Sequence, residues 1–245
     1  MVSIAGRPIL GYILQWLAEQ GVDGVGINLH YRPEAIEAYV GDGRRFGLTV
    51  RYSLERELLG SAGALRPLRS FLEEGGGPFA AVYGDTLSTL DLGPLAAWHG
   101  RSAATLTIAV MEHPNPTEAG IVELADHEPW HGGTAGRITR IQEKPAPDDV
   151  FSTIANAGIF VMSPRVVDHV PDGGPSDIAR DLIPTLLAAG ERVSAWQIPV
   201  SAVVWDVGTW SSYERAQREW PAIWANRPRR ATAASGGQPV TSDTP

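Results

Sequence analysis

Residues 79–85 read Phe-Ala-Ala-Val-Tyr-Gly-Asp, an apolar run that ends in a glycine and a carboxylate. A short apolar run bounded by a turn signal is typical of a buried strand. In open α/β sheets, ligands bind beyond the carboxyl ends of the strands, so a carboxylate at that place faces the crevice. The stretch therefore predicts a strand over 79–83 and a candidate functional residue at Asp85.

Helices and strands alternate in the sequence before this strand. Pro8 can start a helix whose apolar residues lie on one face, and Gly21 ends that helix. The expected order is helix 8–21, strand 25–29, helix 33–40, strand 48–52 and helix 62–72. Such alternation is typical of a sheet covered by helices. We therefore predict an α/β fold with a Rossmann-like, mostly parallel sheet flanked by helices.

Strands dominate the sequence after residue 100. We expect strands at 105–111, 120–124, 138–143 and 157–162 with few helices between them, so this half should be mixed or antiparallel. A helix at 177–187, strands at 193–198 and 202–205, and a helix at 209–224 complete the expected domain, residues 1–225. Residues 226–245 are mainly small, polar or basic, which predicts a disordered tail.

The composition excludes several classes of protein. The chain has 245 residues, no cysteine and a net charge of −8. Disulfide scaffolds and cysteine metal sites are excluded, and the acidic excess argues against non-specific contacts with nucleic-acid phosphates. No apolar run approaches the roughly 18 residues that span a bilayer, and no signal-peptide pattern opens the chain. We expect a cytoplasmic protein without nucleic-acid or membrane partners.

A second aspartate occupies the same kind of place as Asp85. Asp206 directly follows the apolar stretch Val203-Val204-Trp205. Mg²⁺ typically takes one or two protein carboxylates and completes its coordination with water and phosphate oxygens. Either aspartate alone is well explained as the cap of a turn. The pair, however, predicts a shared Mg²⁺ site.

Small residues join the strand at 48–52 to the helix that follows it, namely Gly60, Ser61, Ala62 and Gly63. Such residues let a flat ligand approach the backbone amides at the start of a helix, so the segment is a candidate site for a nucleobase or a phosphate. A tight turn capped by Ser61 explains the same residues equally well. The segment matches neither a P-loop nor a G-x-G-x-x-G fingerprint.

Lys144 is the only lysine among the 20 basic residues. It follows Glu143 at a predicted strand end, where Pro145 breaks the ladder. An ammonium group is a compact point charge that suits one phosphate oxygen, so we predict that Lys144 binds phosphate; chance survival of one lysine codon is the alternative. Glu143 could accept a sugar hydroxyl, and Asn156 at the start of the next strand could present its amide to the same ligand.

Taken in order, these segments resemble the sugar-1-phosphate nucleotidyltransferases, the NDP-sugar pyrophosphorylases. The resemblance is strongest to short members similar to mannose-1-phosphate guanylyltransferase. It is carried by residues 5–10, 57–64, 84–85, 120–122, 143–145, 156–158 and 205–209. It implies the nucleotide-diphospho-sugar transferase type of fold.

The resemblance also implies roles for single residues. Asp85 and Asp206 would hold Mg²⁺ and, together with Lys144, would be the catalytic residues. The nucleobase would lie at Gly60, Ser61, Ala62 and Gly63, and the sugar phosphate at Gly120, Glu143, Lys144 and Asn156. An oxygen of the sugar 1-phosphate, expected to be mannose 1-phosphate, would attack the α-phosphorus of a nucleoside triphosphate, expected to be GTP, and release pyrophosphate. Because this nucleophile is already ionised near neutral pH, the reaction needs positioning and charge neutralisation and no general base.

The sequence departs from the family at its beginning. Family members start with a strand and a Gly-rich loop, G-G-x-G-T-R, followed by P-K, and these residues hold the triphosphate. The 245 residues contain no such loop, and Met1 falls just after its expected place. We therefore expect the first strand and the Gly-rich loop to be missing, which leaves the domain at 1–225 incomplete at its N-terminus.

Three functions remain open from the sequence. The chain could be an active nucleotidyltransferase whose gene product is longer, or a catalytically silent subunit that binds a sugar nucleotide and regulates a paralogous catalytic subunit. A metal-dependent glycosyltransferase is disfavoured because no D-x-D motif follows the strand at 79–83. The expected partners are a nucleoside triphosphate and a sugar 1-phosphate, and assembly into a homo-oligomer is left open.

Overall fold

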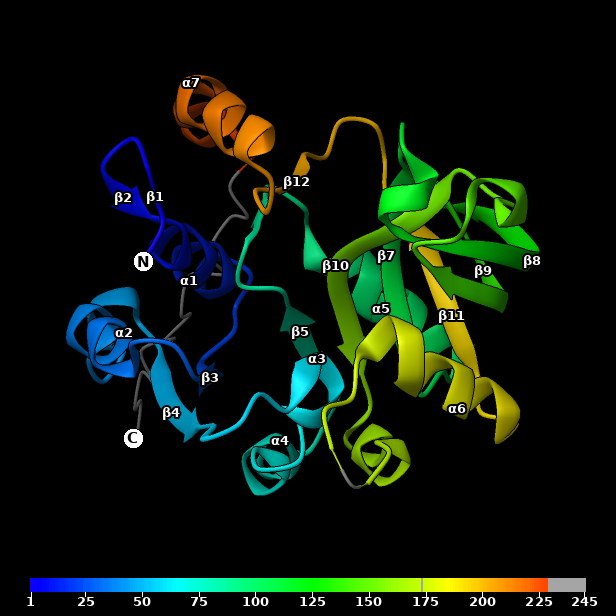
Figure 1. Ribbon diagram of the computed structural model, residues 1–245, viewed down its shortest axis with the longest axis horizontal. Coiled ribbons are helices and arrows are strands. Elements are labelled where there is room, and N and C mark those ends of the chain that lie inside the picture. Colours follow the sequence, from blue (N-terminus) through cyan, green and yellow to red (C-terminus); the bar gives the residue numbers. More distant parts are fainter. Residues whose placement is uncertain (173, 229–245) are drawn as a thin grey trace, which may run out of the picture.

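The computed structural model describes residues 1–172 and 174–228, and its centre is a six-stranded sheet. In spatial order the strands are β5 (Phe79–Val82), β10 (Ile154–Met162), β7 (Leu106–Glu112), β11 (Val193–Gln197), β9 (Gly133–Glu143) and β8 (Gly120–Trp130). The β7–β11 pair is parallel, and the other pairs of this sheet are antiparallel. Figure 1 shows β8 and β9 at the far end of the sheet from β5.

Three two-stranded sheets accompany the large one. β3 (Gly24–Leu29) and β4 (Thr49–Leu54) are parallel; β6 (Thr86–Ser88) pairs antiparallel with β12 (Val204–Asp206), and β1 (Ser3–Ile4) with β2 (Arg7–Pro8). In the described part of the chain β3 pairs only with β4, and β5 only with β10. No ladder therefore joins the β3–β4 sheet to the six-stranded one.

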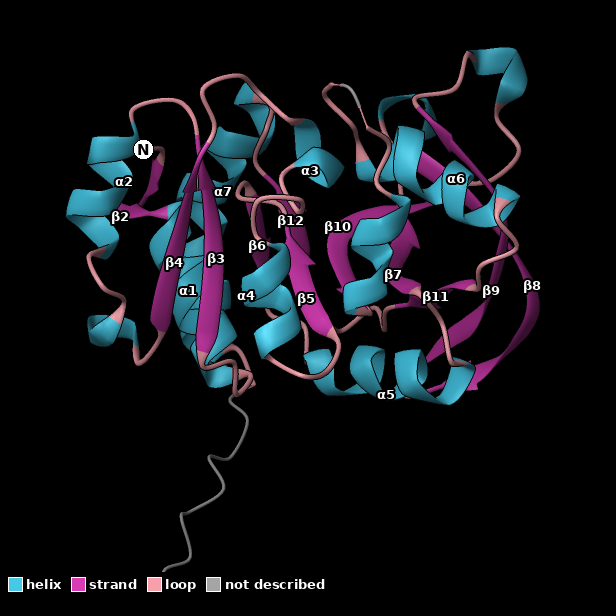
Figure 2. Ribbon diagram, turned by 90° about the horizontal axis from the view of Figure 1, so that it is seen from below, coloured by secondary structure: helices cyan, strands magenta, loops and turns pink. Residues whose placement is uncertain are grey.

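Helices cover both faces of the six-stranded sheet and also pack against the β3–β4 sheet. They are α1 (Ile9–Glu19), α2 (Pro33–Val40), α3 (Gly60–Gly63), α4 (Arg69–Glu74), α5 (Leu92–Ser102), η5 (Ile178–Leu182) running into α6 (Ile183–Ala188), and α7 (Trp210–Asn226). Shorter turns are η1 (Arg44–Phe46), η2 (Pro116–Glu118), η3 (Pro147–Asp149) and η4 (Pro164–His169). Figure 2 shows α5 and α6 on opposite sides of the sheet. None of the described helices is long and apolar enough to cross a membrane.

The core has two layers because the side chains of a strand alternate between its faces. In β10, Ile159 and Val161 pack into a cluster with α1, α5 and α7, whereas Phe160 and Met162 pack into a second cluster with α6. All four side chains are buried. A third cluster lies between β3, β4, α1 and α2. Burial on both faces is what makes these strands nearly continuous apolar runs in the sequence.

The predicted α/β class is confirmed, but the sheet is mixed and not mostly parallel. In the described residues only the β3–β4 and β7–β11 pairs are parallel. β5 follows the alternating part of the chain but pairs antiparallel with β10 from the strand-rich half. The helix expected at 62–72 is divided into α3 and α4, with Pro67 between them, and proline cannot continue a helical hydrogen-bond ladder. The tail predicted at 226–245 falls almost entirely outside the described residues.

Candidate active site

Two carboxylates meet where β5 and β12 end. Asp85 lies in the turn between β5 and β6, and Asp206 is the last residue of β12. The β6–β12 ladder places Asp206 opposite Thr86, and the amide of Val207 donates to the Asp85 carbonyl at 3.1 Å. A methyl group on Gly208 would lie 2.8 Å from Asp206 Oδ1 and 3.6 Å from Asp85 Oδ2. Asp206 Oδ1 also accepts the amide of Gly208 and so caps its own turn, while both carboxylates lie close to one point beside Gly208.

The electrostatics of this pair suit a divalent cation. Although one side of Asp85 is open to solvent, the partial burial of its carboxyl group and, second, the negative charge of Asp206 raise its pKa. A cation between two such groups relieves their repulsion. Oxygen donors from one or two carboxylates are what Mg²⁺ takes from proteins. Clusters of three or more His, Cys, Asp or Glu side chains suited to a metal are absent from the described part of the chain.

The small residues of α3 allow two distant stretches of backbone to touch. Gly60 has a φ of 77°, and a methyl group there would lie 2.4 Å from the carbonyl oxygen of Ser176. The amides of Ala62 and Gly63 donate to this same oxygen at 2.8 and 3.1 Å. Because Ala62 and Gly63 are buried and their amides are used, only Gly60 and Ser61 keep surface that a ligand can reach.

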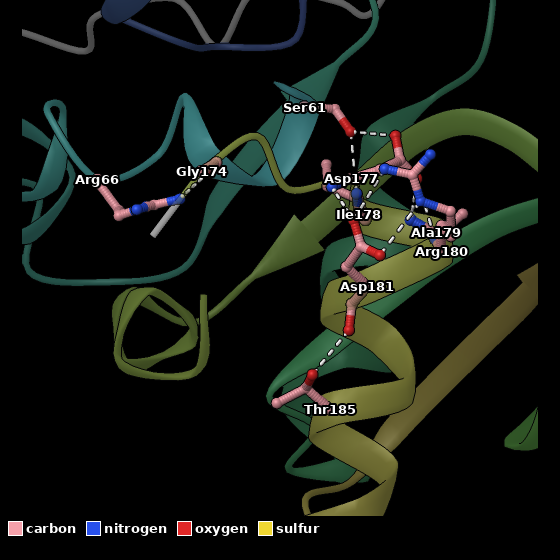
Figure 3. A network of polar contacts seen from close by, with 9 residues as sticks. All are labelled: Ser61, Arg66, Gly174, Asp177, Ile178, Ala179, Arg180, Asp181 and Thr185. Atoms are coloured by element: carbon pink, nitrogen blue, oxygen red, sulfur yellow. Dashed lines mark hydrogen bonds and ion pairs between the residues drawn. The ribbon is translucent and has the colours of Figure 1, made fainter. Parts of the chain in front are cut away.

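Ser61 bridges α3 to the start of η5 and does not cap its own turn. Its hydroxyl donates to Asp177 Oδ2 at 2.6 Å and accepts the amide of Ile178 at 2.9 Å. Figure 3 shows Ser61 directed at this end of the helix. The alternative of a turn capped by Ser61 is therefore wrong, and the hydroxyl has a tertiary role that the sequence did not reveal.

Gly120 and Glu143 face each other across the β8–β9 ladder. A methyl group on Gly120 would lie 2.5 Å from Glu143 Oε2 and 3.6 Å from the Cβ of Ala179. Glycine therefore makes room for the carboxylate, which lies beside η5. Burial and, second, the negative charge of Asp177 raise the pKa of Glu143, against the opposing effect of nearby Lys144.

Lys144 is exposed at the end of β9. Its φ of 45° is left-handed, which is uncommon for a residue other than glycine, and its amide donates to the carbonyl of Ala119 at 3.1 Å. Conformations of this kind often occur at functional sites. In the described residues no carboxylate forms an ion pair with its ammonium group, which is thus available to an anion.

Tyr83, in the turn after β5, and Asn156, on β10, lie beside each other near α3. Asn156 Oδ1 accepts the amide of Gly158 at 2.8 Å, which leaves its NH₂ group for another acceptor. The Tyr83 hydroxyl interacts with the side chains of both Ser61 and Asn156, and burial raises its pKa. A methyl group on Gly158 would lie 3.0 Å from the Tyr83 ring, so β10 passes close to the turn that carries Asp85.

Sequence reasoning missed Tyr83, Asp177 and also Glu55. Glu55 is buried, and its carboxylate accepts the side-chain amide of Asn28 and the backbone amide of Leu59, both at 3.0 Å. It thus fixes the chain just before α3. A signal existed only for Asp177, which precedes an apolar helical run as an N-cap does. The partners of Glu55 and Tyr83 come from other elements, and no local pattern indicates them.

The structure thus brings the candidate residues together in three groups. One is the Asp85–Asp206 pair, one is Gly60–Gly63 with Ser176 and Asp177, and one is Gly120 with Glu143 and Lys144. Tyr83 interacts with Ser61 of the second group and with Asn156. The negative charge of Asp177 acts on Glu143 of the third group, against the positive charges of Lys144 and Arg180.

The chain is similar to known nucleotidyltransferases over most of its length. The model of the family described as nucleotidyl transferase matches residues 1–222. A UTP–glucose-1-phosphate uridylyltransferase from Synechocystis sp. is 31% identical over 91% of this chain and 56% of that protein. A mannose-1-phosphate guanylyltransferase from Mycobacterium tuberculosis is 29% identical over 89% of this chain and 57% of that protein. The chain thus spans a little over half the length of these relatives.

Solved structures share the fold. An apo UDP-glucose pyrophosphorylase superposes with a TM-score of 0.73 at 18% identity, covering 93% of this chain and 90% of that one. A putative glucose-1-phosphate thymidylyltransferase from Bacillus anthracis gives a TM-score of 0.72 at 19% identity, covering 88% of this chain and 83% of that one. At such identities the likeness concerns the fold alone.

Proposed function

Because the chain belongs to the nucleotidyl transferase family, we propose that it supplies the metal, base and sugar-phosphate sites of an enzyme that joins a nucleoside monophosphate from a nucleoside triphosphate to a sugar 1-phosphate. The observation that carries this proposal is the convergence of Asp85 and Asp206 at the ends of β5 and β12. Carboxylates at strand ends face the crevice in which α/β folds bind ligands. The groups formed by α3 and by the β8–β9 edge lie to either side of η5 and supply two further walls.

Each group has a distinct task in this reaction. Asp85 and Asp206 would hold Mg²⁺, which when bound neutralises charge on the phosphate oxygens. Lys144 places an ammonium group against the phosphate of the sugar, and Glu143 accepts a sugar hydroxyl. Gly60 and Ser61 offer the reachable surface for the base. The attacking phosphate oxygen is ionised near neutral pH, so these residues bind and orient, and none of them has to remove a proton.

For the substrates we propose GTP and mannose 1-phosphate. The pair is supported by the relative from Mycobacterium tuberculosis, whose name is mannose-1-phosphate guanylyltransferase. The competing pair is UTP and glucose 1-phosphate, named for the relative from Synechocystis sp.. Calorimetric titration of GDP-mannose and of UDP-glucose, each with Mg²⁺, separates them. Tighter binding of GDP-mannose is expected, tighter binding of UDP-glucose would reverse the choice, and failure of both to bind would contradict the proposed function.

The second candidate is a catalytically silent subunit that binds a sugar nucleotide. It differs from the first candidate in the G-G-x-G-T-R loop, which the resemblance assigns to the triphosphate and which the 245 residues do not contain. Reading the DNA upstream of the Met1 codon separates the two candidates. An in-frame G-G-x-G-T-R would favour the enzyme, whereas a stop codon would favour the binding subunit.

A further inference from the structure

Asp177 joins a loop and a helix that lie far apart in the sequence. Its Oδ2 accepts the hydroxyl of Ser61, a residue 116 positions away. Its Oδ1 accepts the backbone amides of Ala179 and Arg180, both at 2.9 Å, which caps the start of η5. Figure 3 shows both sets of bonds on one carboxylate. We call the Ser61–Asp177 contact, together with the bond from the Ile178 amide to Ser61, the clasp.

Backbone hydrogen bonds next to the clasp also join α3 to the segment just before η5. The Ser176 carbonyl accepts two amides of α3, and the Ser176 amide donates to the carbonyl of Leu59 at 2.7 Å. Asp177 itself is held in place, because its amide donates to Asp181 Oδ2 at 2.7 Å. A carboxylate with this many partners is fixed in one orientation. The position of α3 therefore depends on the position of the η5 start.

The other side of η5 touches the candidate sugar-phosphate group. The Cβ of Ala179 lies 3.6 Å from where a methyl group on Gly120 would lie, and Glu143 Oε2 lies at 2.5 Å from the same point. The negative charge of Asp177 also acts on Glu143. One short segment, residues 176–180, thus contacts α3 on one side and the Gly120–Glu143 wall on the other.

We propose that Asp177 is a positioning residue that couples the nucleotide loop (residues 60–63) to the sugar-phosphate wall (Gly120 and Glu143). This inference rests on the proposed function, which assigns a substrate to each side. A ligand that orders one side makes the clasp more rigid, so the second ligand has less motion to suppress. Binding of nucleotide should then strengthen binding of sugar 1-phosphate, and the reverse by the same factor.

The first test needs no ligand. Serine at position 177 still accepts amides as an N-cap, but its single short oxygen cannot also reach Ser61, so Asp177→Ser removes the Ser61–Asp177 bond of the clasp and spares the cap. The readout is hydrogen exchange of the Ala62 and Gly63 amides in the full chain. Thr185→Val is the matched control, because it removes a hydroxyl bond to the Asp181 carbonyl on the same helix. Faster exchange in Asp177→Ser alone is expected; unchanged exchange would overturn the proposal.

The second test measures coupling between the two ligands. Mannose 1-phosphate is titrated calorimetrically with and without a non-hydrolysable GTP analogue and Mg²⁺. We expect the analogue to raise the affinity several-fold in the wild type and in Thr185→Val, and to have no effect in Asp177→Ser and Ser61→Ala. Equal coupling in all four proteins, or none in the wild type, would overturn the proposal. If the wild type binds neither ligand, the proposed function fails, and the exchange rates alone then decide the positioning role.

Discussion

At the scale of single residues, Lys144 offers a sharp test because its charge can be kept while its shape is changed. Lys144→Arg should weaken binding of sugar 1-phosphate, since the wider guanidinium cannot occupy the place of one ammonium group. Lys144→Ala should weaken it further, by about 1.5–3 kcal/mol, the value of a charge-assisted hydrogen bond. Binding of the base should be unaffected in both. Calorimetric titration of sugar 1-phosphate into the three proteins measures the effect.

The control for Lys144 lies on β9, the strand that ends just before it. Arg140 is an exposed cation of β9 whose guanidinium packs over the Phe151 ring at 4.0 Å. Arg140→Ala removes a charge from the same hairpin but not from the site, so it should leave the affinity for sugar 1-phosphate nearly unchanged. Equal affinities in wild type, Lys144→Arg and Lys144→Ala would mean that Lys144 only ends a strand.

What the sequence reveals about single residues depends on how local their signal is. Asp85 and Asp206 each follow an apolar strand directly, so their convergence could be predicted from two local patterns. Their roles in binding a metal stay predictions. The partners of Ser61 could not be predicted, because a hydroxyl bonds whatever the fold brings to it. Asp177 lies 116 residues away, and only the tertiary structure joins the two.

At the scale of elements, α5 is joined to β7 by a buried histidine. His99 is 2% exposed; its Nδ1 lies 2.9 Å from Thr107 Oγ1, and its Nε2 lies 3.1 Å from Ser163 Oγ. Burial and, second, the positive charge of Arg165 lower the pKa of His99 below its ordinary value of 6.5. The folded protein therefore holds this side chain neutral under conditions in which the unfolded chain would protonate it.

The sign of the resulting pH dependence follows from this lowered pKa. Above pH 6.5 the histidine is neutral in both states, and its contribution to the free energy of unfolding is complete. As the pH falls below 6.5 toward the lowered pKa, the unfolded state gains the proton and stability is lost. Thermal midpoints between pH 8 and pH 5 should fall less steeply in His99→Gln than in the wild type. The exposed His127→Gln is the control, and identical slopes for His99→Gln and wild type would contradict the account.

Element boundaries show where local patterns stop being sufficient. The helix at 33–40 is confirmed, and the strand expected at 25–29 is found as β3, because their periodicity is not interrupted. The strand expected at 120–124 continues to Trp130 as β8, and the strand expected at 138–143 already begins at Gly133 as β9. The hairpin that they form is therefore longer than predicted. The polar residues and Pro129 near the end of β8 are typical of a loop. In the structure the β8–β9 ladder shifts its register twice before Pro129 and continues through it to Trp130.

At the scale of the molecule, the sequence predicts how helices and strands alternate, but it does not predict which strands pair with one another. The first half is alternating and the second half is rich in strands, as expected, but β5 joins the two halves through an antiparallel pair with β10. Such a pairing depends on which edges meet in space. The sequence likewise does not predict that β3 and β5 share no ladder in the described residues.

A prediction at this scale concerns turnover by the 245-residue chain alone. No residue in it matches the triphosphate loop that the resemblance implies, and even one preorganised donor is worth about 3 kcal/mol of transition-state stabilisation. Release of pyrophosphate from GTP and mannose 1-phosphate should therefore stay at background. A coupled pyrophosphate assay measures it, with a complete nucleotidyltransferase as the positive control. An ordinary enzymatic rate from this chain would refute the prediction.

The central claim is that Asp85 and Asp206 together hold a divalent cation against the phosphates of the substrate. The measurement that tests it most directly is the affinity for GDP-mannose with Mg²⁺ and with EDTA, in the wild type, in Asp206→Asn and in the control Asp126→Asn, whose aspartate pairs with Arg137 on the β8–β9 hairpin. We predict that Mg²⁺ raises the affinity roughly tenfold or more in the wild type and the control, equivalent to ~1.4 kcal/mol. In Asp206→Asn the metal should have no effect, while the thermal midpoint stays nearly unchanged. Undiminished Mg²⁺ dependence in Asp206→Asn would contradict the account and leave Asp206 with the role of a turn cap alone, through its bond to the Gly208 amide.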